Sequence, residues 1–419
     1  MGDGEKKRKI KPDTPVPATY DEIVEGVPDR DVTITTASRL LGVRSPQLKD
    51  VLRQHGSESV GQFITLEQIA KAYALLRPDL CILSDAHFTT DDGLEGLIRL
   101  ITYLDEPVKR RDTSPINKIL SGSAFDHVRE LPEQTVQTVV SSPPYWGTRV
   151  YPENFTVNWS DGTTTPFGGE QTPEEYIRHT VEFFLLLSPV LKQSGTVWWN
   201  VGDIYNTRSP IRGGSLERMN AMSDGDGKTW TEYDARRYSS GHEFLKDKDL
   251  TLIPYRLAEA LQRAGFWVRS IIIWQKENVV PESVNDRPTN ACEVVLLVSN
   301  SEQYKFDEMQ WRESDKIGGP NPDETENLRT VWTFRTATGD ENHAAPFPIE
   351  LPARCITLST EPEDIVYDPF MGSGTTGVAS RELNRNYIGS EIVDEYIRDA
   401  EERIGKTDAQ TKTQLDDFV

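Results

Sequence analysis

The sequence predicts an α/β fold in which a mixed sheet is flanked by helices, with a small helical domain before it. The run 137–140 is β-branched and typical of a buried parallel strand, which two prolines then end. Residues 365–368 form another such run, followed by a glycine-rich turn and the start of a helix. The next strand, 386–391, ends in a carboxylate, Glu391. Because strands and helices alternate, we expect ligands to bind beyond the carboxyl ends of the strands.

Residues 1–107 are expected to lie outside this sheet. Residues 1–18 are polar and hold a basic run and three prolines, which predicts a disordered tail; contact of the basic run with phosphates is the alternative. Residues 19–107 predict a helical domain that resembles a helix-turn-helix, with a second helix from Ser45 and a further helix from Phe63. DNA contact by this domain and a packing or dimerisation role both stay open.

The main domain is expected to span 117–405, after a charged linker over 108–116. Apolar periodicity places helices at 173–191, 252–265, 349–358 and 395–404, and strands at 195–203, 266–274 and 294–299. The last two strands are expected to pair with each other. Residues 406–419 are polar and predict a disordered tail.

The segment after the first strand carries groups that suit a planar heterocycle. The motif reads Ser142-Pro143-Pro144-Tyr145. A hydroxyl and a proline carbonyl can accept the two N–H bonds of an exocyclic amine, and the tyrosine ring offers a stacking surface. Taken alone, the segment favours a simpler interpretation, a strand followed by a rigid turn.

The second segment has the features of a nucleoside site. Its residues are Asp368, Phe370, Gly372, Ser373, Gly374 and Thr375, with Glu391 at the end of the following strand. Glycines allow a ligand to approach the backbone closely, and a carboxylate at a strand end binds ribose hydroxyls. No Lys follows the glycines, so the segment is not a P-loop.

Together the two segments resemble the amino-methyltransferases that modify DNA at cytosine N4 or adenine N6. The first is similar to their catalytic motif and the second to their S-adenosylmethionine motif, and the resemblance runs from about Asn117 to Ile404. The catalytic motif comes first, as in the permuted beta group of that family. The resemblance implies a Rossmann-like S-adenosylmethionine-dependent methyltransferase fold, S-adenosylmethionine as cofactor and double-stranded DNA as substrate. It also allows a cognate restriction enzyme as a partner.

The resemblance implies roles for single residues around the cofactor. We expect Asp368 to hold its methionine amino group and Glu391 its ribose hydroxyls. Phe347 and Pro348 lie in a segment similar to the one that covers the cofactor in relatives. Ser123 stands where relatives usually have an acid, so its role as a ligand stays open.

Two further positions border the expected cleft. Asp203 ends a strand there, and it either orients the base or a loop or caps the chain. Cys292 stands where relatives commonly have His before the glutamate, Glu293. We expect this pair only to buttress the cleft by packing.

The resemblance places target recognition between the two motifs, where residues 205–250 lack apolar periodicity. A loop of this length inside a domain is usually functional or disordered. Guanidinium groups bind guanine edges and phosphates, so we interpret this insert as the DNA reader. A loop without such a role is the alternative. The candidate DNA-binding residues, including two from a later loop similar to a family segment close to DNA, are Arg208, Arg212, Arg218, Arg236, Arg237, Lys276 and Arg287.

The predicted chemistry is direct methyl transfer to a base that has left the duplex. Ser142 and the Pro143 carbonyl would accept the amine protons and aim the nitrogen lone pair at the methyl group, while Tyr145 stacks on the base. No Pro-Cys pair is present, so attack at cytosine C5 through a covalent adduct is not supported. Ser at the first motif position is associated with cytosine N4 in relatives. Adenine N6 and a catalytically silent DNA-binding regulator are the alternatives.

The net charge of −21 is unusual for a protein that binds DNA, because phosphate contacts supply much of the affinity. The chain has 67 Asp and Glu against 46 Lys and Arg, and only 17 of the basic residues are Lys. We interpret this excess as adaptation to the high-salt cytoplasm of a halophile, where charges are screened over about 3 Å at 1 M salt. An acidic protein that binds no nucleic acid is the alternative.

The cysteines and the apolar runs predict a reduced, cytoplasmic protein. Cys81, Cys292 and Cys355 are far apart and have no metal-ligand spacing, so no metal site is expected. No apolar signal segment opens the sequence, and no run reaches membrane-spanning length.

Overall fold

The computed structural model describes part of the N-terminal region and most of the chain after it. The described residues are 31–34, 45–54 and 60–69, isolated positions between 37 and 104, and then 108–148, 156–170, 172–206, 245–246, 248–279, 285–313, 328–336 and 347–416. The chain forms two compact units. The first holds Met1–Pro107 with Trp159–Thr163 and Glu259–Gly265, and the second holds the remaining residues from Val108 onward.

The first unit contains a helix and a two-stranded antiparallel sheet, whose elements are α3 (Ser45–Gln54), β1 (Asp31–Thr33) and β2 (Phe63–Thr65). Helix α3 buries Leu48, Val51 and Leu52, so the helix expected from Ser45 is confirmed. Its outer face carries polar side chains, including Arg53 beside Asp50. The helix expected before α3 lies largely outside the described residues.

The prediction of a helix starting at Phe63 was wrong, because Phe63–Thr65 pairs with β1. Helical residues begin at Leu66. The Thr65 hydroxyl accepts a hydrogen bond from the Gln68 backbone, and the Gln68 side chain accepts one from the Thr65 backbone. This reciprocal cap sets the start of the helix after the strand.

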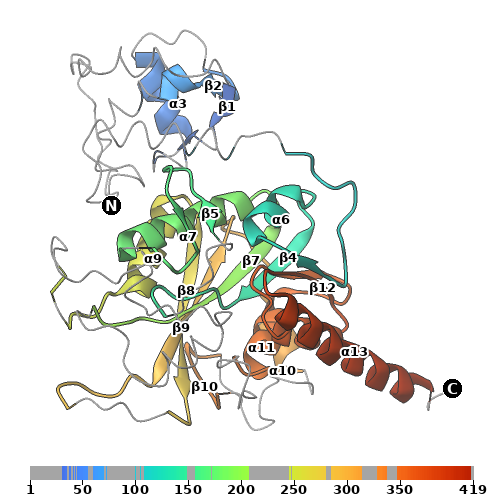
Figure 1. The fold of residues 1–419 in the computed structure, drawn as a ribbon. Helices are drawn as coiled ribbons and strands as arrows, with labels where there is room; N and C mark the ends of the chain where they lie inside the picture. The colour runs from blue at the N-terminus through green and yellow to red at the C-terminus, as the bar shows by residue number, and fades with distance from the viewer. Residues whose placement is uncertain are drawn as a thin grey trace, which may run out of the picture. The chain divides into compact units, whose positions relative to one another are not determined.

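The second unit is built on an eight-stranded sheet in the order β10-β8-β9-β7-β4-β11-β12-β3 (Figure 1). The strands are β3 (Lys118–Ser121), β4 (Val136–Ser141), β7 (Leu191–Val201), β8 (Trp267–Lys276), β9 (Cys292–Ser299), β10 (Val331–Phe334), β11 (Ile365–Asp368) and β12 (Asn386–Glu391). Strand β9 pairs antiparallel with β7 and β8, and the other pairings in this sheet are parallel. The predicted mixed sheet is therefore confirmed, and β9 runs opposite to the other seven strands. A separate hairpin joins β5 (Val157–Asn158) to β6 (Thr164–Thr165).

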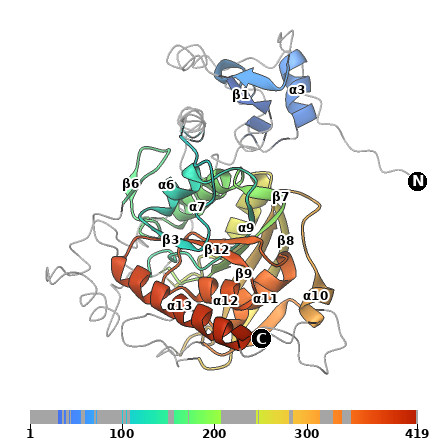
Figure 2. The same ribbon diagram turned by 90° about the vertical axis from the view of Figure 1, so that its right-hand side faces the viewer.

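Helices cover both faces of this sheet (Figures 1 and 2). On one face lie α6 (Ala124–Glu130), α7 (Pro173–Leu187) and α9 (Ile253–Arg263); on the other lie α10 (Glu308–Arg312), α11 (Glu350–Ser359), α12 (Thr375–Glu382) and α13 (Asp394–Asp416). Trp198 and Trp199 show why both faces need cover, since successive strand residues point to opposite sides. Trp198 packs beside Trp332, with ring centroids 5.9 Å apart, and Trp199 packs beside Phe184 at 5.1 Å.

Two helix ends differ from the prediction. Helix α7 ends at Leu187, because Leu191 already begins β7 and the chain must turn between them. Helix α13 continues to Asp416, so the tail expected after 405 is helical over most of its length. No glycine or proline follows Gly405, and an ion pair joins Glu402 to Lys406 one turn later at 2.7 Å. None of the helices that the structure describes is long and apolar enough to cross a membrane.

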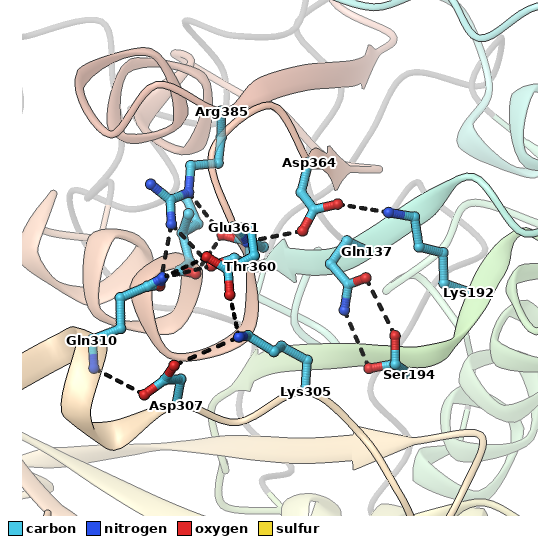
Figure 3. Close-up of polar contacts among 11 residues, drawn as sticks. Gln137, Lys192, Ser194, Lys305, Asp307, Gln310, Thr360, Glu361, Asp364 and Arg385 are labelled. Carbon is cyan, nitrogen blue, oxygen red and sulfur yellow. Dashed lines mark hydrogen bonds and ion pairs between the residues drawn. The ribbon is translucent and has the colours of Figure 1, made fainter.

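The amino ends of the central strands carry a network of ion pairs and hydrogen bonds (Figure 3). Lys192 at the start of β7 pairs with Asp364 before β11 at 2.6 Å. Lys305 pairs with Glu361 after α11, and Arg385 before β12 donates to Thr360. These contacts tie β7, α11 and β12 together at the end of the sheet opposite to the catalytic motif.

Candidate active site

A cavity of about 580 Å³ lies at the carboxyl ends of the central strands, a volume typical of small-molecule sites. Strands β4 and β11 are neighbours and parallel, so the two sequence motifs reach the same edge of the sheet. The predicted residues that line the cavity are Ser142, Pro143, Pro144, Tyr145, Phe370, Gly372, Ser373, Thr375, Glu391, Ser123, Phe347 and Lys276. The structure thus brings both motifs to one cavity.

The loop that carries the catalytic motif is held by the segment 166–170 and by helix α7. The Tyr176 hydroxyl donates to the Pro144 carbonyl at 3.0 Å, and the Gly147 backbone donates to the Gly168 carbonyl at 2.7 Å. Gly168 has φ +86°, and a Cβ there would lie 2.9 Å from the Pro144 side chain. The Pro144 carbonyl is therefore occupied, whereas no described residue is seen to donate to the carbonyl of Pro143.

Tyr145 is the centre of a hydrogen-bonded cluster in the cavity. Its hydroxyl donates to Glu293 Oε2 at 2.5 Å and accepts from the Ser142 hydroxyl at 3.2 Å. The Asn200 amide nitrogen lies 2.7 Å from the Tyr145 hydroxyl, 2.9 Å from Glu293 Oε2 and 3.3 Å from Ser142 Oγ. Burial, and then the negative charge of Glu293, hold the pKa of Tyr145 well above its usual value, so the phenol keeps its proton.

Glu293 and Asn200 are functional candidates that sequence reasoning missed. We expected Glu293 only to support the cleft by packing, but its side chain lines the cavity and pairs with Lys276 at 2.5 Å. Because β9 runs antiparallel, its first residues reach the edge at which the other strands end. Asn200 is 2% exposed and lies near the carboxyl end of β7. Because ligands bind at the carboxyl ends of the strands, its position in the sequence could have identified it.

Gly202 fixes the place of the Tyr145 ring. A Cβ at position 202 would lie 2.8 Å from Cε2 of Tyr145 and 2.9 Å from its Cδ2. The ring therefore packs against bare backbone at the end of β7. Any side chain at this position would have to displace Tyr145 from its contact with Glu293.

Glu391 forms the wall of the other half of the cavity. Its Oε2 accepts from the Gly372 backbone at 2.8 Å, and its Oε1 accepts from the backbone of Ile392 and Val393 at 2.9 Å each. These bonds fix the carboxylate beside the glycine turn. The ring of Phe370 stacks on Phe167 with centroids 5.5 Å apart. A fixed carboxylate beside an aromatic wall suits a nucleoside.

Asp368 lies at the predicted strand end, but its carboxylate does not line the cavity. It is 1% exposed and accepts from the hydroxyls of Ser141 at 2.6 Å and Thr376 at 2.7 Å, and from the Phe370 backbone at 3.0 Å. Burial raises the pKa of Asp368 to about 6. In this structure Asp368 joins β4, β11 and α12, and its contact with a ligand amine stays a prediction.

Other predicted cofactor residues act partly through the protein itself. Gly374, with φ +82°, does not line the cavity; a Cβ there would lie 2.7 Å from the Ala400 side chain, so the glycine lets α12 approach α13. The Ser373 hydroxyl accepts from Arg403 at 2.6 Å. Ser123 lines the cavity and also caps α6 by accepting from Phe125. Pro348 is buried and is not among the lining residues.

The predicted DNA-binding residues are placed only in part. The five arginines of the insert, Arg208, Arg212, Arg218, Arg236 and Arg237, lie outside the described residues. The two ends of the insert are joined by a bridge between Tyr205 and Leu250. The Arg287 guanidinium stacks 3.7 Å from the Tyr205 ring centroid. Lys276 faces the cavity rather than a DNA backbone surface, since its ammonium group pairs with Glu293.

Asp203 caps the start of α9, which is one of the two roles expected for it. Its Oδ1 accepts from the Thr251 hydroxyl at 2.7 Å and from the Ile253 backbone at 3.3 Å, at the start of α9. Within the described parts of the chain, no group of His, Cys, Asp and Glu side chains is arranged to hold a metal ion.

The chain resembles DNA methyltransferases in sequence. Residues 136–402 match the family model described as DNA methylase, which covers N6 and N4 methyltransferases. The chain is 37% identical over 291 residues to the type II methyltransferase M.Cfr9I of Citrobacter freundii, covering 68% of this chain and 87% of the relative. It is 36% identical over 295 residues to M.SmaI of Serratia marcescens, covering 68% and 90%. A solved PvuII cytosine-N4-specific DNA methyltransferase aligns with a TM-score of 0.47 at 18% identity, over 68% of this chain and 85% of that one. The chain belongs to the N6/N4 family of DNA methylases.

Proposed function

We propose that this protein transfers a methyl group from S-adenosylmethionine to N4 of a cytosine turned out of double-stranded DNA. One observation carries the proposal: the motif Ser142–Tyr145 and the turn at Gly372 line a single cavity. Membership of the DNA methylase family supports the same chemistry. The chain order, with Ser142 before the turn at Gly372, supports assignment to the permuted beta group.

The residues present fit the proposed cofactor. The Glu391 carboxylate and the apolar ring of Phe370 suit the ribose and the adenine, and Gly372 leaves space at the turn, since a Cβ there would lie 4.0 Å from its nearest neighbour. Phe347 lines the same cavity. When bound, S-adenosylmethionine supplies an electrophilic methyl group. The protein contributes binding, orientation and exclusion of water.

The catalytic half acts on the target amine. Its lone pair is delocalised into the base ring, which makes the amine a poor nucleophile. Ser142 Oγ and the Pro143 carbonyl accept its two N–H bonds and direct the lone pair at the methyl group, without a covalent enzyme intermediate. Tyr145 offers its ring to the flipped base, and Ser at the first motif position favours cytosine over adenine.

DNA binding is assigned to the insert 205–250, with a contribution from Arg287. We place the protein in the cytoplasm of a halophile, within a restriction-modification system. The net charge of −21 supports the high-salt assignment, because carboxylate repulsion is screened in molar salt. Folding and activity should then persist in molar KCl and fade at low salt. Activity confined to low ionic strength would contradict it.

The test is transfer of tritiated methyl groups to duplex DNA, followed by digestion to nucleosides and mass spectrometry. We expect label in N4-methylcytosine. Label in N6-methyladenine would change the target but keep the enzyme class. Binding of cofactor and DNA without transfer would identify a silent DNA-binding regulator instead.

A further inference from the structure

The hydrogen bonds around Tyr145 have a direction. The Glu293 carboxylate can only accept hydrogen bonds, so the Tyr145 hydroxyl donates its single proton to Oε2, 2.5 Å away. The Tyr145 oxygen then accepts, from the Asn200 amide at 2.7 Å and from the Ser142 hydroxyl at 3.2 Å. The proton of Ser142 therefore points along the chain of hydroxyls toward Glu293. The Asn200 amide nitrogen lies 3.3 Å from Ser142 Oγ, which keeps a second lone pair to accept a proton from the cavity.

The groups around Glu293 hold its carboxylate in this position. Lys276, from the end of β8, pairs with Oε1 at 2.5 Å, and Asn200, from β7, donates to Oε2 at 2.9 Å. Tyr145 completes the set from the loop after β4. The Glu293 side chain is 15% exposed, so solvent screens these contacts only partly. Strands β7 and β8 and the loop after β4 thus position one carboxylate behind the catalytic motif.

We propose that Glu293 is the final proton acceptor of the methyl transfer, acting through Tyr145 and Ser142. This proposal rests on the proposed function, since it concerns the amine that the catalytic motif binds. Glu293 touches neither cofactor nor amine in this scheme and is a positioning residue for the two hydroxyls. The proposal holds for a cytosine or an adenine amine, because both lose one proton on methylation.

The amine nitrogen uses its lone pair to form the bond to the methyl carbon, and the carbon–sulfur bond breaks with its electron pair staying on sulfur. The nitrogen, now positively charged, gives one proton to Ser142 Oγ and recovers the N–H electron pair. Ser142 passes its own proton to the Tyr145 oxygen, and Tyr145 passes its proton to Glu293 Oε2. Glu293 ends the turnover protonated and returns the proton to water.

The first test is single-turnover methyl transfer by Glu293→Gln, with cofactor affinity measured by titration on the same preparation. Removing a positioned proton acceptor should slow transfer about 100-fold. Cofactor affinity should stay within twofold, because Glu391 and Gly372 are untouched. Glu293→Asp should recover part of the rate. Glu361→Gln is the matched control: it also removes a glutamate paired with a lysine, but at the far end of the sheet, and should transfer at the wild-type rate.

The second test separates the relay from a packing role. Tyr145→Phe keeps the ring and breaks the relay, so we expect a similar fall in rate. In the double variant Tyr145→Phe/Glu293→Gln the rate should lie within about threefold of Tyr145→Phe alone, because both changes interrupt one path. A double variant slowed by the product of the two single effects would overturn the proposal. So would a wild-type rate in Glu293→Gln. Absence of transfer by the wild-type protein would instead refute the proposed function.

Discussion

The two ends of the central strands hold polar networks of different kinds. At the amino ends, each charged group meets a partner from another element, as Lys305 meets Glu361 and Lys192 meets Asp364 (Figure 3). At the carboxyl ends, the Glu293, Tyr145 and Ser142 network faces a cavity and leaves acceptor capacity on Ser142. The first arrangement closes on itself and the second is open to a ligand. Substitutions at the amino ends should therefore change stability alone, and those in the network that faces the cavity should change binding or rate.

The largest expected effect concerns Asp368, which is buried at the cavity end but not in the cavity. Its folded pKa of about 6 lies above the ordinary 3.8, so the folded state binds the proton more tightly than the unfolded state. Stability is therefore lost as pH rises from about 4 to above 6, by about 3 kcal/mol for this group. Asp368→Asn cannot ionise and lacks this loss.

The measurement is chemical denaturation of wild type and Asp368→Asn at several pH values and constant salt. The difference in free energy of unfolding should shift by about 3 kcal/mol in favour of the variant across that window. A difference that is flat, or that shifts the other way, would show that the Asp368 carboxylate is stabilised rather than penalised by its site.

The next effect concerns the cofactor half. Glu391→Ala removes a carboxylate that we expect to bind ribose hydroxyls, and should weaken cofactor binding by about 1–3 kcal/mol. Isothermal titration with S-adenosylmethionine measures this directly. Circular dichroism on the variant checks that the turn at Gly372, which donates to Glu391, remains folded. Wild-type affinity in a folded variant would remove Glu391 from the cofactor site.

The smallest effect is expected at the amino ends. The Lys305 and Glu361 side chains are 28% and 57% exposed, and ion pairs of this exposure contribute about 0–1 kcal/mol. Lys305→Ala should therefore lower the free energy of unfolding by no more than about 1 kcal/mol. Methyl transfer should be unchanged. A large loss of transfer by this variant would break the distinction between the two ends of the sheet.

Local sequence patterns predicted the parts of the fold that depend on periodicity and strand order. Strand β4 and the turn after β11 were found in this way, and their parallel pairing explains why both motifs share one cavity. The role of Asp368 was not predictable, because its partners Ser141 and Thr376 come from two other elements that only the fold brings together.

Glu293 was missed for a different reason. A search of strand ends fails for a strand that runs in reverse, and the direction of β9 follows from its pairing with β7 and β8. Phe63–Thr65 was assigned to a helix, since a segment of three residues is too short for periodicity to distinguish a strand from a helix. Its pairing with β1 decides the structure. In each case a long-range contact decided what the local pattern left open.

The central claim is that one cavity holds separable catalytic and cofactor halves, and Ser142→Ala tests it most directly. The change removes one acceptor for the target amine but leaves the Pro143 carbonyl and every contact of Glu391 in place. Single-turnover transfer and cofactor titration should be measured on the same preparation. We predict a rate lowered at least tenfold, which corresponds to about 1.4 kcal/mol, with cofactor affinity near that of the wild type. Transfer at the wild-type rate would contradict the account and leave the Ser142 hydroxyl as a strand-end cap.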